Sequence, residues 1–268
     1  MKVGDAVTKF KVGDEVFGVS TVFQDGTHSE YVKIAENQLH FKPKQITMYE
    51  AAAIGYAGFT ANSVFDHVKT SDCVFINGGS GGVGICLIQL LKTRDCEVHI
   101  TCSPKNFQKA IQFGADYVYD YRDQMIYPER FNQSIESSKF NVMIDSFPIE
   151  KKMVDYLVDK IKSDGQYINL HPFRFLSKPT FKQQFSTMME ELAIAKKFRK
   201  KKIVNGYVFA SAPVPLACYS LARLSSLIED NRLKADINQI FYLSEAIEAF
   251  EYFASSSRSG KVLLNFCE

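Results

Sequence analysis

The segment Gly78-Gly79-Ser80-Gly81-Gly82-Val83-Gly84 decides the fold predicted for this chain, because it holds five of the 15 glycines in 268 residues. Glycine near a helix start is less stable than alanine, so such a run indicates a place that requires bare backbone. The segment follows an apolar strand candidate at 73–76 and precedes a helix predicted over about 82–93. In that context Gly79-x-Gly81-x-x-Gly84 predicts a turn whose backbone amides, with the helix N-terminus, bind the pyrophosphate of a dinucleotide. The alternative is a tight turn with close helix packing and no ligand.

Strand and helix patterns alternate through the middle of the chain. Further apolar strands are predicted at 97–101, 117–119, 141–145, 166–170 and 206–209. A helix with Ser103 as N-cap and Pro104 as its first residue is predicted to end at Gly114, and another is predicted over about 150–162. These alternations predict an α/β protein with a doubly wound parallel sheet of the Rossmann type, which binds ligands at the carboxyl ends of its strands.

The two ends of the chain have different patterns. Residues 1–47 carry Gly-Asp and Asp-Gly turn signals between alternating segments at 15–19 and 30–34, which predict antiparallel β structure. The C-terminal part predicts a helix over about 215–230, a strand around 240–243 and a last strand over 261–266. Between these strands a helix is predicted with Ser244 as N-cap and Ile247, Ala249 and Phe250 on its apolar face.

The composition is that of an ordinary globular protein, with 46% hydrophobic and 23% charged residues and a net charge of +2. That charge gives no argument for nucleic acid or an anionic membrane as a partner. No apolar run approaches the ~18 residues that span a bilayer. The N-terminus has no targeting pattern, so the chain as it stands is predicted to be cytoplasmic.

The six cysteines stand singly, without a CxxC motif or a zinc-spaced Cys/His pair. We therefore expect buried thiols in a reducing compartment and no metal site.

The end of the second predicted strand sets the expected cofactor. A site for NAD carries an acidic residue about 20 residues after the glycines, where it accepts a hydrogen bond from the ribose 2′-hydroxyl. Here the sequence is Thr101-Cys102-Ser103-Pro104-Lys105, which has no carboxylate. The Ser103 hydroxyl and the Lys105 ammonium suit a 2′-phosphate, which an acid would repel. We expect NADPH rather than NADH; the alternative for Lys105 is a solvated lysine at a helix start.

Three further motifs carry weaker predictions. Tyr156 to Lys160 matches the YxxxK of short-chain dehydrogenases, but its place in a helix pattern favours a surface pair. The basic run 196–202 is expected to be a solvated helix face rather than a nuclear signal or phosphate site. The five histidines form no metal-binding pair, and His171 is either a polar group near the nicotinamide or a loop residue.

From end to end, the chain resembles the medium-chain dehydrogenase/reductase superfamily, in its zinc-independent quinone-oxidoreductase branch. The matching motifs are 10–18 (FKVGDEVFG), 25–32, 50–52 with 60–61, 78–84, 114–116 with 120–121, and 260–262. The resemblance implies a partial GroES-like catalytic domain in 1–48, a Rossmann domain in 49–215 and a return to the catalytic domain in 216–268. Family members carry a further segment before the position matching Lys2. We expect a partial sequence, the alternative being a protein that lacks half of its catalytic domain. A mitochondrial location is expected where the full-length protein has a transit peptide.

The resemblance also implies the remaining site residues. The pyrophosphate would be lined by Ser80, Gly82 and Val83, and the adenosine phosphate would be reached by Tyr121 and Arg258. One side of the nicotinamide would be bordered by Asn169, Leu170, Phe209 and Ala210, and the other side of its ring would be faced by Tyr56 and Thr60. Core or packing roles are the alternatives for Tyr56, Tyr121 and Phe209. No catalytic acid is identified.

The reaction implied is a metal-free transfer of hydride from NADPH to a quinone or an α,β-unsaturated carbonyl, a small-molecule acceptor being the expected partner. A homodimer is left open. The alternatives are a non-catalytic nucleotide-binding redox sensor or interaction protein, and a 2-enoyl thioester reductase.

Overall fold

The computed structural model describes residues 2–20, 26–122, 139–147, 157, 159–170, 180, 182–183, 189, 202–205, 214–254 and 259–266. The chain forms two compact units. Unit 1 comprises Met1–Phe65, Gly81–Leu90 and Phe209–Glu268, and unit 2 comprises Asp66–Ser80 and Leu91–Val208. The division into domains expected from the sequence remains a prediction.

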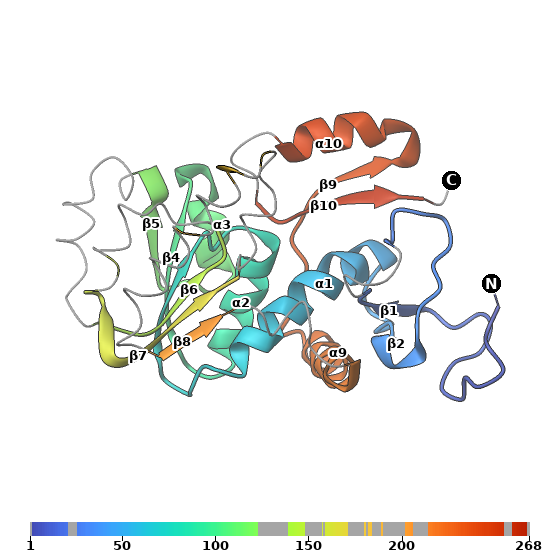
Figure 1. Cartoon of the computed structure of the whole chain (residues 1–268), viewed down its shortest axis with the longest axis horizontal. Coiled ribbons are helices and arrows are strands. Elements are labelled where there is room, and N and C mark those ends of the chain that lie inside the picture. The colour runs from blue at the N-terminus through green and yellow to red at the C-terminus, as the bar shows by residue number, and fades with distance from the viewer. Residues whose placement is uncertain are drawn as a thin grey trace. The chain divides into compact units, whose positions relative to one another are not determined.

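Unit 2 is built on a six-stranded sheet whose neighbouring strands all run parallel (Figure 1). Its strands are β3 (Cys73–Asn77), β4 (Glu97–Cys102), β5 (Tyr117–Asp120), β6 (Phe140–Asp145), β7 (Ile161–Asn169) and β8 (Lys202–Asn205), in the spatial order β5-β4-β3-β6-β7-β8. Val74, Phe75 and Ile76 in the centre of β3 are fully buried, as expected for a parallel sheet. The predicted Rossmann-type sheet is confirmed, and its strand order reverses between β3 and β6.

Two boundaries in this sheet differ from the prediction. β7 begins at Ile161, so the predicted helix over 150–162 is wrong at its C-terminal end. The register between β6 and β7 shifts after Phe140, and the extra residues of β7 bulge around Gly165, where a Cβ would lie 2.5 Å from the Ile161 side chain. The sixth strand is 202–205, and the predicted strand at 206–209 lies outside the described residues.

The helices that follow β3 and β4 are close to those predicted. α2 (Gly82–Lys92) buries Leu87, Ile88 and Leu91 completely. η2 (Pro104–Asn106) and α3 (Phe107–Gln112) follow Ser103, which is the N-cap as predicted but makes no side-chain capping bond. The chain leaves α3 at Gly114, whose φ of +106° requires glycine.

Unit 1 is centred on α1 (Met48–Phe65), which packs against α9 (Val214–Glu229). Thr47 and Glu50 form a reciprocal capping box at the start of α1. Buried Asn62 of α1 links the two helices, because it donates to Ser220 Oγ and accepts from Arg223. These polar contacts fix how α1 and α9 pack.

Two small sheets complete unit 1. β1 (Val16–Gly18) and β2 (Leu39–Phe41) pair antiparallel, with η1 (Glu36–Gln38) before β2. β9 (Ile237–Tyr242) and β10 (Lys261–Asn265) pair parallel, with η5 (Leu243–Glu245) and α10 (Ala246–Ala254) between them. The strand predicted at 30–34 is not formed, and Tyr31 in it is 75% exposed.

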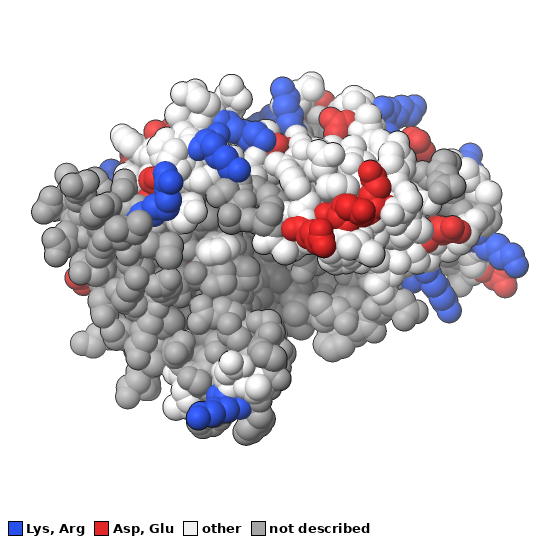
Figure 2. Space-filling model, turned by 90° about the horizontal axis from the view of Figure 1, so that it is seen from above, with Lys and Arg blue, Asp and Glu red and all other residues white. Residues whose placement is uncertain are grey.

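The start and the exposed face of α10 also correct the prediction. The capping residue is Tyr242, whose backbone N–H donates to Glu245, whereas Ser244 lies inside the η5 turn. Ala249 is buried as predicted, but Ile247 is 74% and Phe250 is 57% exposed, so the predicted apolar face is largely at the surface. The glutamates of η5 and α10 at 245, 248 and 251 are all exposed. Figure 2 shows a run of acidic side chains on the face that it presents. Within the described ranges, no helix has both the length and the apolar character needed to cross a bilayer.

Candidate functional site

The glycine turn begins where β3 ends and is held by β4. The Gly78 N–H donates to Thr101 Oγ1 at 3.0 Å, and the Gly79 N–H donates to the Thr101 carbonyl oxygen at 2.9 Å. Gly78 has a φ of +80°, and a Cβ on Gly79 would lie 2.6 Å from the Ile100 Cβ. The turn therefore requires glycine at both positions, one for its backbone angle and one for its close approach to β4.

A buried polar network at the carboxyl ends of the strands supports this turn. Thr101 Oγ1 donates to Asn77 Oδ1, and Asn77 Nδ2 donates to Asp145 Oδ1 at 2.8 Å. The Tyr167 hydroxyl donates to the other Asp145 oxygen, and Ser146 Oγ lies within hydrogen-bond distance of the carbonyl oxygens of both Asn77 and Gly78. Thr101, Asn77, Asp145 and Tyr167 are all buried. The network thus joins the ends of β4, β3, β6 and β7 around the glycine turn.

Asn106 is a residue of this site that the sequence did not indicate. Its Nδ2 group lies 3.2 Å from Ser80 Oγ and 3.1 Å from Ser103 Oγ, and it donates to both. All three side chains are buried. The Asn106 amide therefore joins two predicted site residues, Ser80 and Ser103, that come from different turns. The sequence signal that could have indicated Asn106 is the helix start Ser103-Pro104-Lys105-Asn106.

The remaining glycines of the segment begin α2 in unit 1. Gly81 forms an isolated parallel bridge with Gly260, and its carbonyl oxygen accepts from Ile85 N–H. Val83 and Gly84 are in the first turn of α2, which contains no acidic residue. A helix leaves its first N–H groups without intrahelical acceptors, so this end of α2 offers donors and a positive dipole to an anion.

Lys261 of β10 lies over Gly82, since a Cβ on Gly82 would meet the Lys261 side chain. Burial lowers the pKa of the Lys261 ammonium. Burial also raises the pKa of the Cys86 thiol, one helical turn after Gly82, to about 12. A desolvated cation thus stands beside the helix start, and the thiol near it is neutral at physiological pH.

Residues around the end of β4 bear on the predicted 2′-phosphate contact. Ser103 is buried and Lys105 is exposed. Asp120 ends the neighbouring strand β5, and the Arg122 guanidinium binds both of its carboxylate oxygens and lowers its pKa. Tyr121 lies half-buried between these two residues. The Asp120 carboxylate, on the strand next to the end of β4, is therefore already paired with the Arg122 guanidinium.

The other predicted residues are divided between the units. In unit 2, Asn169 and Leu170 lie at the end of β7, where Leu170 N–H donates to the Asp145 carbonyl oxygen. In unit 1, Tyr56 is 54% exposed on α1, and Thr60 is buried with its hydroxyl donating to the Tyr56 carbonyl oxygen. Phe209, Ala210, Arg258, His171 and Tyr156 lie outside the described residues.

Two of the weaker predictions need correction. Lys160 is only 3% exposed, and burial lowers its pKa, so it is not half of a surface pair. Lys202, the last residue of the basic run, begins β8 rather than ending a helix, while residues 196–201 lie outside the described part.

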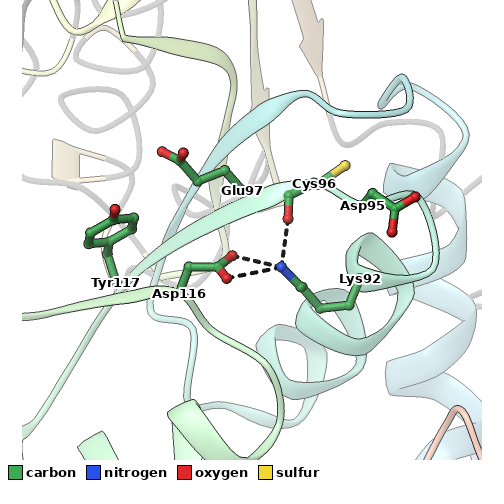
Figure 3. A pocket seen from close by; sticks show the side chains of 6 residues that line it. All are labelled: Lys92, Asp95, Cys96, Glu97, Asp116 and Tyr117. Atoms are coloured by element: carbon green, nitrogen blue, oxygen red, sulfur yellow. Dashed lines mark hydrogen bonds and ion pairs between the residues drawn. The ribbon is translucent and has the colours of Figure 1, made fainter.

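An open pocket of about 490 Å³ lies at the opposite, amino ends of β4 and β5 (Figure 3). Lys92 donates to both oxygens of Asp116 and to the Cys96 carbonyl oxygen in this pocket. Glu97 and Tyr117 point away from that ion pair in Figure 3. The pocket is polar, its cation is already paired, and it is not where a parallel sheet binds nucleotides.

Comparison with known proteins gives one family and a consistent set of relatives. Residues 113–264 match the family model described as zinc-binding dehydrogenase. The mitochondrial NAD(P)H oxidoreductase RTN4IP1 of Dictyostelium discoideum is 26% identical over 99% of this chain and 78% of its own length. The quinone oxidoreductase of Sus scrofa is 33% identical over 53% of this chain and 44% of its own length.

A solved structure supports the same assignment. The quinone oxidoreductase of Coxiella burnetii superposes with a TM-score of 0.78 and 25% identity, covering 99% of this chain and 76% of that protein. The resemblance to the medium-chain dehydrogenase/reductase superfamily and to its quinone oxidoreductases is therefore confirmed.

Proposed function

Because the chain belongs to the zinc-binding dehydrogenase family of the medium-chain dehydrogenase/reductase superfamily, we propose that it is an NADPH-dependent oxidoreductase that reduces a quinone or an α,β-unsaturated carbonyl. Oxidoreductases of NAD(P)H and of quinones are among its relatives. When bound, the nicotinamide cofactor supplies the hydride, and the protein supplies binding, orientation and exclusion of water.

The glycine segment fits a pyrophosphate through its donors. The first N–H groups of α2 have no intrahelical acceptors, no acid competes in its first turn, and the Lys261 ammonium is partly desolvated beside it. The N–H groups of Gly78 and Gly79 are already bonded to Thr101, so they hold the turn rather than the ligand. In the proposed role, Ser80, Gly82 and Val83 donate to the pyrophosphate oxygens.

The observation that carries the preference for NADPH is the charge at the end of β4. Ser103 stands where an NAD site would have an acid, Lys105 follows two residues later, and Asp120 on the neighbouring strand is bound by Arg122. A 2′-phosphate would meet a hydroxyl and an ammonium there rather than an unpaired carboxylate.

Measuring the affinities of the Lys105→Ala variant for NADPH and for NADH tests this preference. Since Lys105 is exposed, one lost phosphate contact should weaken NADPH binding roughly fivefold, which corresponds to about 1 kcal/mol, and leave NADH binding unchanged. The matched control is Lys69→Ala, which removes an exposed lysine at the amino end of the sheet and should alter neither affinity. Equal losses for NADPH and NADH, or no loss at all, would contradict the proposed 2′-phosphate contact.

Turnover separates the proposed reaction from its alternatives. Oxidation of NADPH is followed with a quinone, an enone and a 2-enoyl thioester as acceptors. The proposal expects turnover with the quinone or enone to exceed turnover with the thioester. A preference for the thioester would identify an enoyl reductase, and NADPH binding without any turnover would favour a nucleotide sensor.

The proposal also covers the cellular location and the oligomeric state of the protein. The mitochondrial relatives suggest a mitochondrial protein, which fractionation of cells expressing the full-length gene product would test. Light scattering on the purified chain would decide whether it forms a homodimer.

A further inference from the structure

A second polar cluster lies at the amino ends of β3 and β4, at the opposite end of the strands from the glycine turn. The Cys73 thiol, the Glu97 carboxylate and the His99 imidazole have their ligand atoms all within 4.8 Å of one another. Cys73 and Glu97 are register partners, and His99 follows Glu97 at a spacing of two on the same face of β4. The three side chains therefore meet because the parallel register brings them together.

The distances in the cluster are close to those of a metal site. Cys73 Sγ lies 3.4 Å from Glu97 Oε1, and His99 Nε2 lies 2.6 Å from the same oxygen. Ligand atoms around tetrahedral zinc, at bond lengths of about 2.0–2.3 Å, are about 3.3–3.6 Å apart. To bind zinc, the contact between His99 and Glu97 has to open by less than about 1 Å, and the Cys73 and His99 ligand atoms already lie within 4.8 Å of each other.

Burial and hydrogen bonding suit His99 as a ligand. Its side chain is buried, and its Nε2 atom faces the Glu97 carboxylate on the same face of β4. His99 Nδ1 lies 2.9 Å from the Tyr119 hydroxyl, which can accept its proton when Nε2 binds a metal.

Two features of the cluster oppose metal binding: the protonated Cys73 thiol and the Lys139 ammonium beside Glu97. Burial and the neighbouring Glu97 raise the pKa of the Cys73 thiol to about 12, so coordination must release a proton to solvent. The Lys139 ammonium lies 2.9 Å from Glu97 Oε1 and repels a cation. Its side chain is 32% exposed, however, and all three contacts of Glu97 fall on Oε1, so Lys139 has room to move to Oε2 or to solvent.

We propose that Cys73, Glu97 and His99 bind one divalent transition metal ion of the zinc class, with a fourth position open to water. A thiolate, an imidazole and a carboxylate together favour zinc over calcium or magnesium, which prefer oxygen ligands. All three residues precede the segment 113–264 that matches the zinc-binding dehydrogenase model, so that match does not account for this site. The site also departs from the expectation of no metal drawn from cysteine spacing, because its ligands come from two strands.

The experiment is a titration of the full chain with Co²⁺, after removal of any affinity tag and treatment with a chelator. A thiolate-to-cobalt charge-transfer band should appear, saturate at one ion per chain and disappear when zinc is added. Zinc binding to the unmutated protein should also release the Cys73 proton, which a pH indicator measures in weakly buffered solution. This second measurement remains decisive if a variant fails to fold.

Variants assign the ligands. Cys73→Ala should abolish the band, and Tyr119→Phe, which removes the hydroxyl that orients His99, should weaken binding about 10–100-fold. The matched control is Cys96→Ala, because Cys96 is a buried thiol just before β4 that lies outside the cluster; it should leave the titration unchanged. The proposal is overturned if the unmutated chain gives no band and no proton release, or if the band persists in Cys73→Ala.

Discussion

Replacing Thr101 by valine tests whether the buried network holds the glycine turn. Thr101 is completely buried, and its hydroxyl accepts from Gly78 N–H and donates to Asn77 Oδ1. Valine fills nearly the same volume, so the substitution removes two hydrogen bonds without opening a cavity. A buried group left unpaired destabilises the protein by about 1–3 kcal/mol. Asn77 is buried and Gly78 is half-buried, so the loss of both bonds should cost at least that much. That is a large part of the free energy of unfolding of a typical protein.

The matched variant is Thr101→Ser, which keeps the hydroxyl and loses a methyl group. It should destabilise the protein by about 1 kcal/mol. Urea unfolding followed by circular dichroism and fluorescence gives the free energy for each variant where the two transitions coincide. NADPH affinity should fall further in Thr101→Val than in Thr101→Ser. If the valine variant is as stable as the serine variant, the hydroxyl does not support the turn and the reasoning fails.

Two further predictions follow from the same structure. Gly79→Ala should destabilise the protein by about 1–3 kcal/mol, because the added methyl group overlaps Ile100. Gly82→Ala should cost less, because its closest contacts are the Cδ and Cγ atoms of the Lys261 side chain, which can shift. Urea unfolding compares the two variants, and equal losses would contradict the geometry. Glu97, whose pKa is lowered from 4.5 to about 2 chiefly by its hydrogen bond to His99, stabilises the fold above pH 4.5 and loses that contribution as pH falls toward 2. The difference in melting temperature between the unmutated chain and Glu97→Gln should therefore shrink from pH 6 to pH 2, and a constant difference would refute the assignment.

Local patterns in the sequence were sufficient to predict the parallel sheet and the glycine turn after β3. The apolar run at Val74–Ile76 can only be a buried strand in this context, and the glycines after it leave little choice of conformation. The early start of β7 has a different origin. The residues between Ile161 and Gly165 are mostly polar, and they join the sheet through a bulge that no period-two pattern indicates.

The side chains that complete each cluster depend on strand order, which is not written in local sequence. Asn77 meets Asp145 because β3 pairs with β6, a strand more than sixty residues later in the chain. Glu97 and His99 share a face by their spacing, and this much the sequence does contain. Their approach to Cys73 requires that β4 be the parallel neighbour of β3 with Cys73 opposite Glu97.

The two clusters occupy opposite ends of the same strands, and this separation makes the two proposals independent. Cys73 and Asn77 are four residues apart in β3, about 13 Å along a strand that rises about 3.3 Å per residue. Substitutions separated by more than about 7–10 Å without shared partners have additive effects. Cys73→Ala should therefore leave NADPH affinity unchanged, and Lys105→Ala should leave cobalt binding unchanged. Loss of both properties in either variant would mean that the fold itself had been disturbed, and loss of one alone identifies which end of the sheet holds that ligand.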